Sequence, residues 1–143
     1  MSNPNLAIQE LQNLMLANFE RMVAFEQAAF NIDSKELKLY FEEKADESEK
    51  NIEELNAVLY SLTANNFDVE NQTSSNLLGT TNLFTGQKNM GVVLKHIQYL
   101  EKAVMKWYKK GMTNLKGISY NTSMLLTKHY TGLQVSHLYV QNC

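Results

Sequence analysis

Long stretches without glycine or proline constrain the fold of this chain more than any other feature. The 143 residues include only 6 Gly and 1 Pro. The proline, Pro4, follows Asn3, a pair that suits the N-cap and first position of a helix. From there the chain runs to about Ile32 without another Gly or Pro, and its apolar residues recur every three or four positions. We therefore expect one long helix over this stretch.

Three more segments have the same helical pattern. Asp33 followed by Glu36 resembles a capping box, which predicts a second helix from there to about Leu62. A third helix is expected over residues 90–114 and a fourth after Gly117. The candidate N-caps of the fourth are Ser119 and Asn121. Because no segment carries the alternating pattern of a strand, the sequence predicts an all-α fold.

The connections predict how the four helices are arranged. A short turn near Asp33 makes the first two helices antiparallel neighbours. Between Thr63 and Asn89 the composition shifts to Asn, Thr, Ser and Gly, which indicates a long crossover. Ser74 or Ser75 can cap a short helix within it. We expect one domain, residues 1–143, folded as an antiparallel four-helix bundle with this crossover between its second and third helices.

Composition excludes several classes of function. The net charge is -2 and lysines are spread among glutamates along the helices, so no basic face is expected for nucleic acid. The longest apolar runs fall far short of the ~20 residues of a membrane span, and the N-terminus lacks a basic region leading into an apolar stretch, so we expect neither a membrane span nor a signal peptide. The single cysteine, Cys143, cannot form an internal disulfide, which favours a cytoplasmic protein. No nucleophile triad or phosphate-binding loop is present.

Three ionisable residues fall on the stripes expected to face the core. Glu26 continues the first stripe, Glu101 lies within the third and His137 within the fourth. The expected stripe of the first helix is Ile8, Met15, Phe19, Met22, Glu26 and Ala29. Each polar residue alone has a simpler interpretation: a glutamate whose stem covers the core while its carboxylate reaches water, or a hydrogen-bonded core histidine. Together they suggest one shared polar site, because buried charges need partners.

Several short motifs, in their order and spacing, resemble an uncharacterised bacterial family of ferritin-like four-helix bundles. They are Asn18 to Glu26, Leu39-Tyr40-Phe41, Asp46-Glu47-Ser48, Glu54-Leu55, Leu100 to Ala103, Tyr108, Leu133 and Ser136-His137, with Phe84-Thr85-Gly86 closing the crossover. Ferritin-like di-iron proteins place a Glu on each of two helices and a Glu-x-x-His on each of the other two. The resemblance implies that Glu26 and Glu101 match the two lone glutamates, and that His137 matches one histidine.

The remaining ligand positions of that pattern are degenerate. Gln134 stands where the fourth helix needs a carboxylate, and Ser48 and Asn51 replace both ligands of the second. Such neutral groups are poor ligands for iron or manganese, which disfavours a paired di-metal site. One ion held by Glu26, Glu101 and His137 is the residual metal interpretation. Without metal, a His137 imidazolium between the two glutamates could form the network instead, with Ser48, Asn51 and Gln134 completing it.

Two functions follow as hypotheses. The first is a non-catalytic bundle without a cofactor, acting through protein contacts or self-association, with a homo-oligomer and above all a dimer expected. Tyrosines and Trp107 crowd the second half of the chain and could form an exposed patch for it. The alternative is an iron- or manganese-dependent oxidase, or an iron-binding protein, that uses the residual Glu26, Glu101 and His137 site.

Overall fold

Four long helices make up the computed structural model, which describes residues 4–72, 77–78 and 89–143. They are α1 (Pro4–Asn31), α2 (Lys35–Thr63), α3 (Met90–Asn114) and α4 (Tyr120–Gln141), with a 3-10 turn, η1 (Val69–Asn71), after α2. The described residues contain no strand, so the prediction of an all-α chain with four long helices is confirmed. None of the helices in this part of the chain is long and apolar enough to cross a bilayer.

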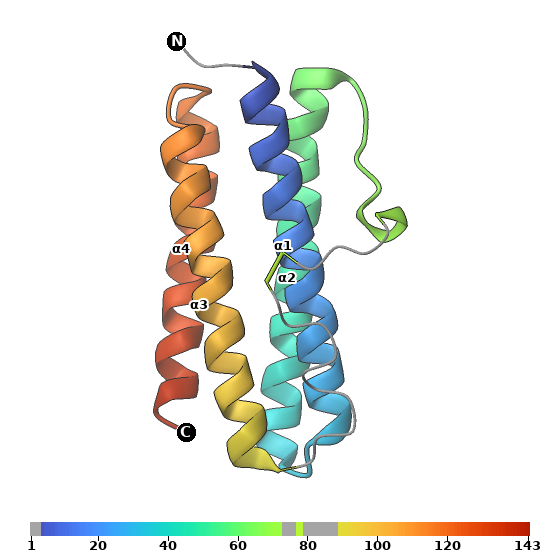
Figure 1. Ribbon diagram of the computed structural model, residues 1–143, viewed down its shortest axis with the longest axis vertical. Coiled ribbons are helices and arrows are strands. Elements are labelled where there is room, and N and C mark those ends of the chain that lie inside the picture. The colour runs from blue at the N-terminus through green and yellow to red at the C-terminus, as the bar shows by residue number, and fades with distance from the viewer. Residues whose placement is uncertain (1–3, 73–76, 79–88) are drawn as a thin grey trace.

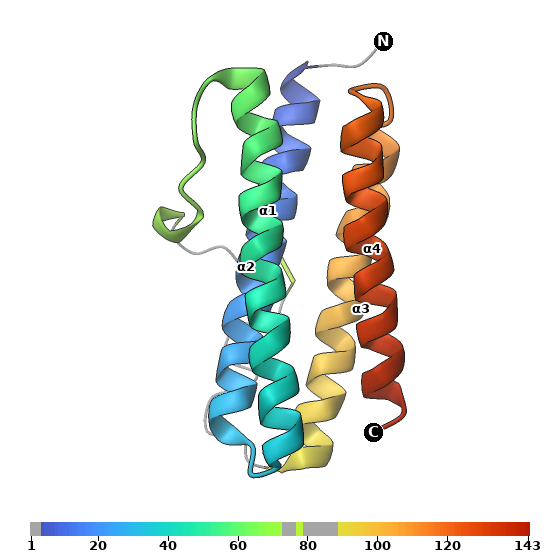
Figure 2. The ribbon, with the colours of Figure 1, turned by 180° about the vertical axis from the view of Figure 1, so that it is seen from behind.

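The four helices lie side by side along one axis, and their order explains the need for a crossover. In Figure 1, α1 descends, α2 returns upward, α3 rises again from the lower end and α4 descends to the C-terminus. The reverse view in Figure 2 shows the same arrangement. Because α2 ends at the opposite end of the bundle from the start of α3, the chain between them must travel the length of the molecule.

Serine and asparagine side chains begin three of the helices. Ser34 caps α2 by accepting a hydrogen bond from the backbone N of Leu37, and Ser119 caps α4 in the same way. Asn89 caps α3. The sequence prediction placed the cap of α2 one residue early, at Asp33. Either residue type can accept this bond, so the pattern alone does not fix the register.

The core is organised around α1, which packs against both α2 and α3, while α4 packs against α3. Its buried positions recur at alternating steps of four and three: Ala7, Leu11, Leu14, Asn18, Arg21, Phe25 and Ala28. The expected stripe was wrong in part, because Met15 and Ala29 are buried but Ile8, Phe19 and Met22 only half-buried, and Glu26 is exposed. The true stripe contains Asn18 and Arg21, which an interpretation based on apolar residues assigns to solvent.

A glycine of α3 allows that helix to lie close to α1. A Cβ placed on Gly111 of α3 would lie 3.0 Å from Cδ1 of Leu14 on α1. α1 and α3 therefore pack tightly at this level, one turn from the polar residues of the core.

The described part of the crossover also packs on α1. Val69 of η1 is buried, and η1 contacts α1. The short helix predicted after Ser74 or Ser75 falls mostly outside the described residues, of which Leu77 and Leu78 form a turn.

Candidate functional site

The three residues expected to share a site do not meet. Glu101 is fully buried and His137 is almost buried, but Glu26 is exposed and lies in a groove between α1 and α2 with Glu42, Asp46 and Glu49. The prediction that Glu26 faces the core is therefore wrong. Its neighbour Phe25 holds the inward position, and one residue further along a helix points about 100° away.

Arg21 takes the interior position instead. Its Nε lies 2.7 Å from Oε1 of Glu101, and neither side chain has any solvent exposure. Nη1 donates to Oγ of Ser48 at 2.8 Å and to Oε1 of Glu47 at 3.1 Å. The guanidinium carbon also lies 4.9 Å from the centroid of the Phe25 ring. One cation of α1 thus joins α2 to α3 through charge-assisted hydrogen bonds.

The charges of this cluster stabilise one another. Burial alone would lower the pKa of Arg21, but the carboxylates of Glu101 and Glu47 outweigh it and raise that pKa above its ordinary value. Burial would likewise raise the pKa of Glu47, yet the charges of Arg21 and Lys44 lower it below its ordinary value. Lys44 contributes through a 3.0 Å ion pair with Oε2 of Glu47. The guanidinium is therefore a permanent interior cation.

A second polar contact joins α2 to α4 beside this cluster. The hydroxyl of Tyr40 donates to Oγ of Ser136 at 3.0 Å, and burial raises the pKa of Tyr40 to about 12. The Tyr40 ring stacks on Tyr139 of α4, with ring centroids 4.1 Å apart. Lys44 Nζ lies 5.2 Å from the centroid of the Tyr40 ring. The contacts of Tyr40 with Ser136 and Tyr139 thus join α2 to α4.

One turn along the bundle, a chain of hydrogen bonds connects all four helices. Asn51 of α2 donates to Oδ1 of Asn18 on α1 at 3.2 Å, and Asn18 donates to the Tyr108 hydroxyl on α3 at 2.8 Å. That hydroxyl lies 2.7 Å from Nδ1 of His129 on α4, whose Nε2 lies 3.0 Å from Oε1 of Glu54. Glu54 returns to α2, three residues from Asn51. We call these five residues the polar ring.

Donor and acceptor rules fix the protons of the polar ring. The Tyr108 hydroxyl accepts from the Asn18 amide, so its own proton can go to Nδ1 of His129. Nε2 of His129 then carries the proton that is donated to the ionised Glu54. Burial lowers the pKa of His129 despite the neighbouring carboxylate, which agrees with a neutral imidazole. His129 is therefore a buried part of the core.

The positions predicted to be degenerate metal ligands take part in hydrogen bonds or face solvent. Ser48 accepts from Arg21 and Asn51 donates to Asn18, while Gln134 is exposed. His137 does not link two glutamates, because its Nδ1 is buried without a hydrogen-bond partner and Glu101 is bonded by Arg21. The prediction that a His137 imidazolium supplies the positive charge of the network is therefore wrong. The guanidinium of Arg21 on α1 supplies it instead.

The donor set does not fit a metal of the ferritin-like kind. Both carboxylates that reach the interior at this level, Glu101 and Glu47, accept hydrogen bonds from Arg21. A divalent ion at this place would lie beside a fixed positive charge that could not be deprotonated. Among the described residues, no group of three or more His, Cys, Asp or Glu side chains is placed to hold a metal ion.

Comparison of the chain with models of known protein families finds no match, and no curated protein matches it. The relation to ferritin-like proteins therefore stays a prediction.

Sequence reasoning missed the two residues that organise the core. Of the 13 Lys and Arg residues, only residue 21 is an arginine, and it lies three residues after Asn18 and four before Phe25. That signal was available, since arginine is the basic residue best suited to buried ion pairs. His129 carried a weaker signal, because it lies one turn before the buried Leu133.

Proposed function

We propose that this chain is a non-catalytic, ferritin-like bundle that acts by associating with a second copy of itself through the outer face of α4. The stripe of exposed apolar residues on that helix carries the proposal. Tyr120, Met124, Val135 and Leu138 are 77%, 52%, 61% and 57% exposed. With Thr131 they recur at helical spacing, so they form one continuous face.

This face of α4 carries no unpaired charge, so it is suited to pack against the same face of a second copy of the chain. α4 contains no Asp or Glu, and its one lysine, Lys128, pairs with Glu54 of α2 at 3.1 Å. A helix that is apolar on its outer face as well as its inner face is normally covered on both. Nothing in this stripe repels a second copy.

The spacing is also self-complementary. If two α4 helices met antiparallel about a two-fold axis beside Thr131, Met124 of one copy would oppose Leu138 of the other, and Thr127 would oppose Val135. A two-fold interface uses the same patch on both subunits. The stripe meets that condition from Met124 to Leu138, over about four turns.

The polar core supports the non-catalytic part. In a di-metal protein the inward carboxylates bind ions, whereas here Arg21 binds Glu101 and Glu47. Four helices with a long connection between α2 and α3 and a buried polar cluster support the proposal of a ferritin-like bundle in which an arginine stands in place of metal charge.

Solution mass tests self-association. The wild-type chain is expected to run at twice its monomer mass in analytical ultracentrifugation, and Val135→Glu with Leu138→Glu should give a folded monomer. Leu39→Glu on α2 is the matched control, because Leu39 is equally exposed at 59%. A wild-type monomer at high concentration, or a dimer that survives both substitutions, would refute the α4 interface.

Elemental analysis tests the non-catalytic part separately. Protein purified after expression in medium supplemented with iron and manganese is expected to carry neither metal in stoichiometric amount. Stoichiometric metal that is lost in His137→Ala would instead favour the oxidase or iron-binding alternative.

A further inference from the structure

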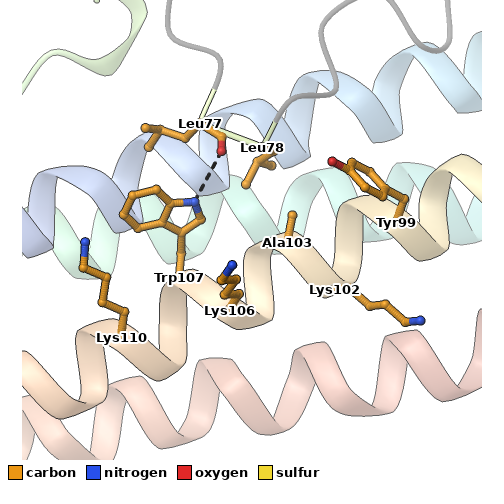
Figure 3. A pocket seen from close by; sticks show the side chains of 8 residues that line it. All are labelled: Leu77, Leu78, Tyr99, Lys102, Ala103, Lys106, Trp107 and Lys110. Carbon is orange, nitrogen blue, oxygen red and sulfur yellow. Dashed lines mark hydrogen bonds between the residues drawn. The ribbon is translucent and has the colours of Figure 1, made fainter.

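A cleft lies on the outer side of α3, beneath the part of the crossover that contains Leu77 and Leu78. Its volume is about 570 Å³, within the range of small-molecule sites. Figure 3 shows its lining, which consists of Leu77, Leu78, Tyr99, Lys102, Ala103, Lys106, Trp107 and Lys110. The cleft differs in composition from the polar core, because its lining combines apolar side chains with lysines.

Two anchors hold the crossover above the cleft. The carboxylate of Glu20 on α1 accepts hydrogen bonds from the backbone N of Leu77 at 2.8 Å and of Leu78 at 3.2 Å. Trp107 Nε1 donates to the carbonyl of Leu77 at 3.4 Å, and Figure 3 shows the indole standing up from α3 to meet it. The two leucines and the indole therefore form a defined apolar wall.

The charged part of the lining has one sign. Lys102, Lys106 and Lys110 occupy successive turns of α3, and none of the described residues that line the cleft is acidic. Lys110 is partly engaged, since its Nζ lies 4.9 Å from the centroid of the Trp107 ring and 3.9 Å from Oε1 of Glu10. In Figure 3 the Lys102 amine points away from the crossover, whereas Lys106 lies beside Trp107. Lys106 is the cation best placed to meet a ligand held against the indole.

We propose that this cleft binds a small amphipathic carboxylate, with its anionic head at Lys106 and its apolar body against Trp107, Leu77 and Leu78. The head would gain a charge-assisted hydrogen bond from an exposed lysine. The body would cover apolar surface of the two leucines and the indole. The site is independent of the α4 interface, so failure of one proposal leaves the other standing.

The protein carries its own reporter for this test. Trp107 is the only tryptophan in the chain, so fluorescence excited selectively at the indole and not at the tyrosines reports on the cleft. Decanoate, kept below its critical micelle concentration, is expected to change that fluorescence saturably. Decanol has the same tail without the charge and should bind at least about tenfold more weakly, while acetate, the head alone, should produce no change.

A charge reversal at the cleft completes the test. Lys106→Glu should weaken decanoate binding by about tenfold or more in the same titration. Lys109→Glu is the matched control, because Lys109 is an exposed lysine of the same helix that does not line the cleft and the net charge changes equally. It should retain the wild-type affinity within about twofold. Absence of a saturable response to decanoate, equal affinity for decanol, or equal weakening by both reversals would overturn the proposal.

Discussion

Arg21 and Glu101 stand 80 residues apart in sequence, yet the guanidinium Nε lies 2.7 Å from the carboxylate in an interior without solvent exposure. A buried ion pair is not by itself strong evidence for stability, because both charges lose their hydration. Its importance is that each partner depends on the other. Together with Ser48 and Glu47, the pair determines how α1, α2 and α3 are placed around the centre of the bundle.

Removing the arginine alone should be severely destabilising. Arg21→Met leaves Glu101 buried without its cation, and the loss of one partner of such a pair costs about 3–5 kcal/mol. Urea denaturation followed by circular dichroism measures the change. Lys50→Met, at an exposed position of α2, serves as the control and should stay within about 0.5 kcal/mol of wild type.

The double variant Arg21→Met with Glu101→Leu should recover most of the loss, since no charge is then left unpaired. An additive double variant would contradict this account.

The sequence predicted the helices well because helix formation depends on local pattern. The range predicted for α3, residues 90–114, agrees with the observed helix Met90–Asn114, and Glu101, which was predicted to face the core, is buried. Tertiary pairing is not local, and there the prediction failed. Whether Arg21 faces water or the core depends on a carboxylate 80 residues away. Both Glu26 and Arg21 are charged residues in the sequence. Only the position of α1 between α2 and α3 determines that Arg21 is buried and Glu26 is exposed.

The polar ring gives a second stability prediction. Tyr108→Phe removes the hydroxyl that accepts from Asn18 and donates to His129, so one donor and one acceptor remain buried without partners. Each orphaned group costs about 1–3 kcal/mol, so the two together predict a loss of about 2–6 kcal/mol, measured by urea denaturation. Tyr99→Phe, where the tyrosine is 55% exposed, should leave stability unchanged. Equal effects of the two substitutions would show that the ring contributes nothing.

The end of α2 offers a stabilising substitution. Ala64 caps this helix in the left-handed region, with φ 59° and ψ 20°, and its N–H donates to the carbonyl of Tyr60. A Cβ disfavours this conformation by about 1–2 kcal/mol, and glycine is the usual residue at such a position. Ala64→Gly should therefore raise the free energy of unfolding, by up to about 1 kcal/mol after the greater entropy of unfolded glycine is included. Thermal and urea midpoints would both rise, and an unchanged or lower midpoint would argue against a strained cap.

Acid should weaken the bundle through Glu47. Burial would raise its pKa, but Arg21 and Lys44 lower it below the ordinary value, so the unfolded chain binds a proton more readily than the folded one. The stabilisation from Glu47 is therefore complete above the ordinary carboxyl pKa of about 4.3 and disappears as pH falls through the lower folded value. Urea denaturation at several values between about pH 6 and about pH 3 should show stability falling with pH. Glu47→Gln should reduce that slope because it cannot titrate, whereas Glu43→Gln, at an exposed position of the same helix, should keep it. If both variants retain the full slope, the carboxylate beside Arg21 is not what couples this fold to pH.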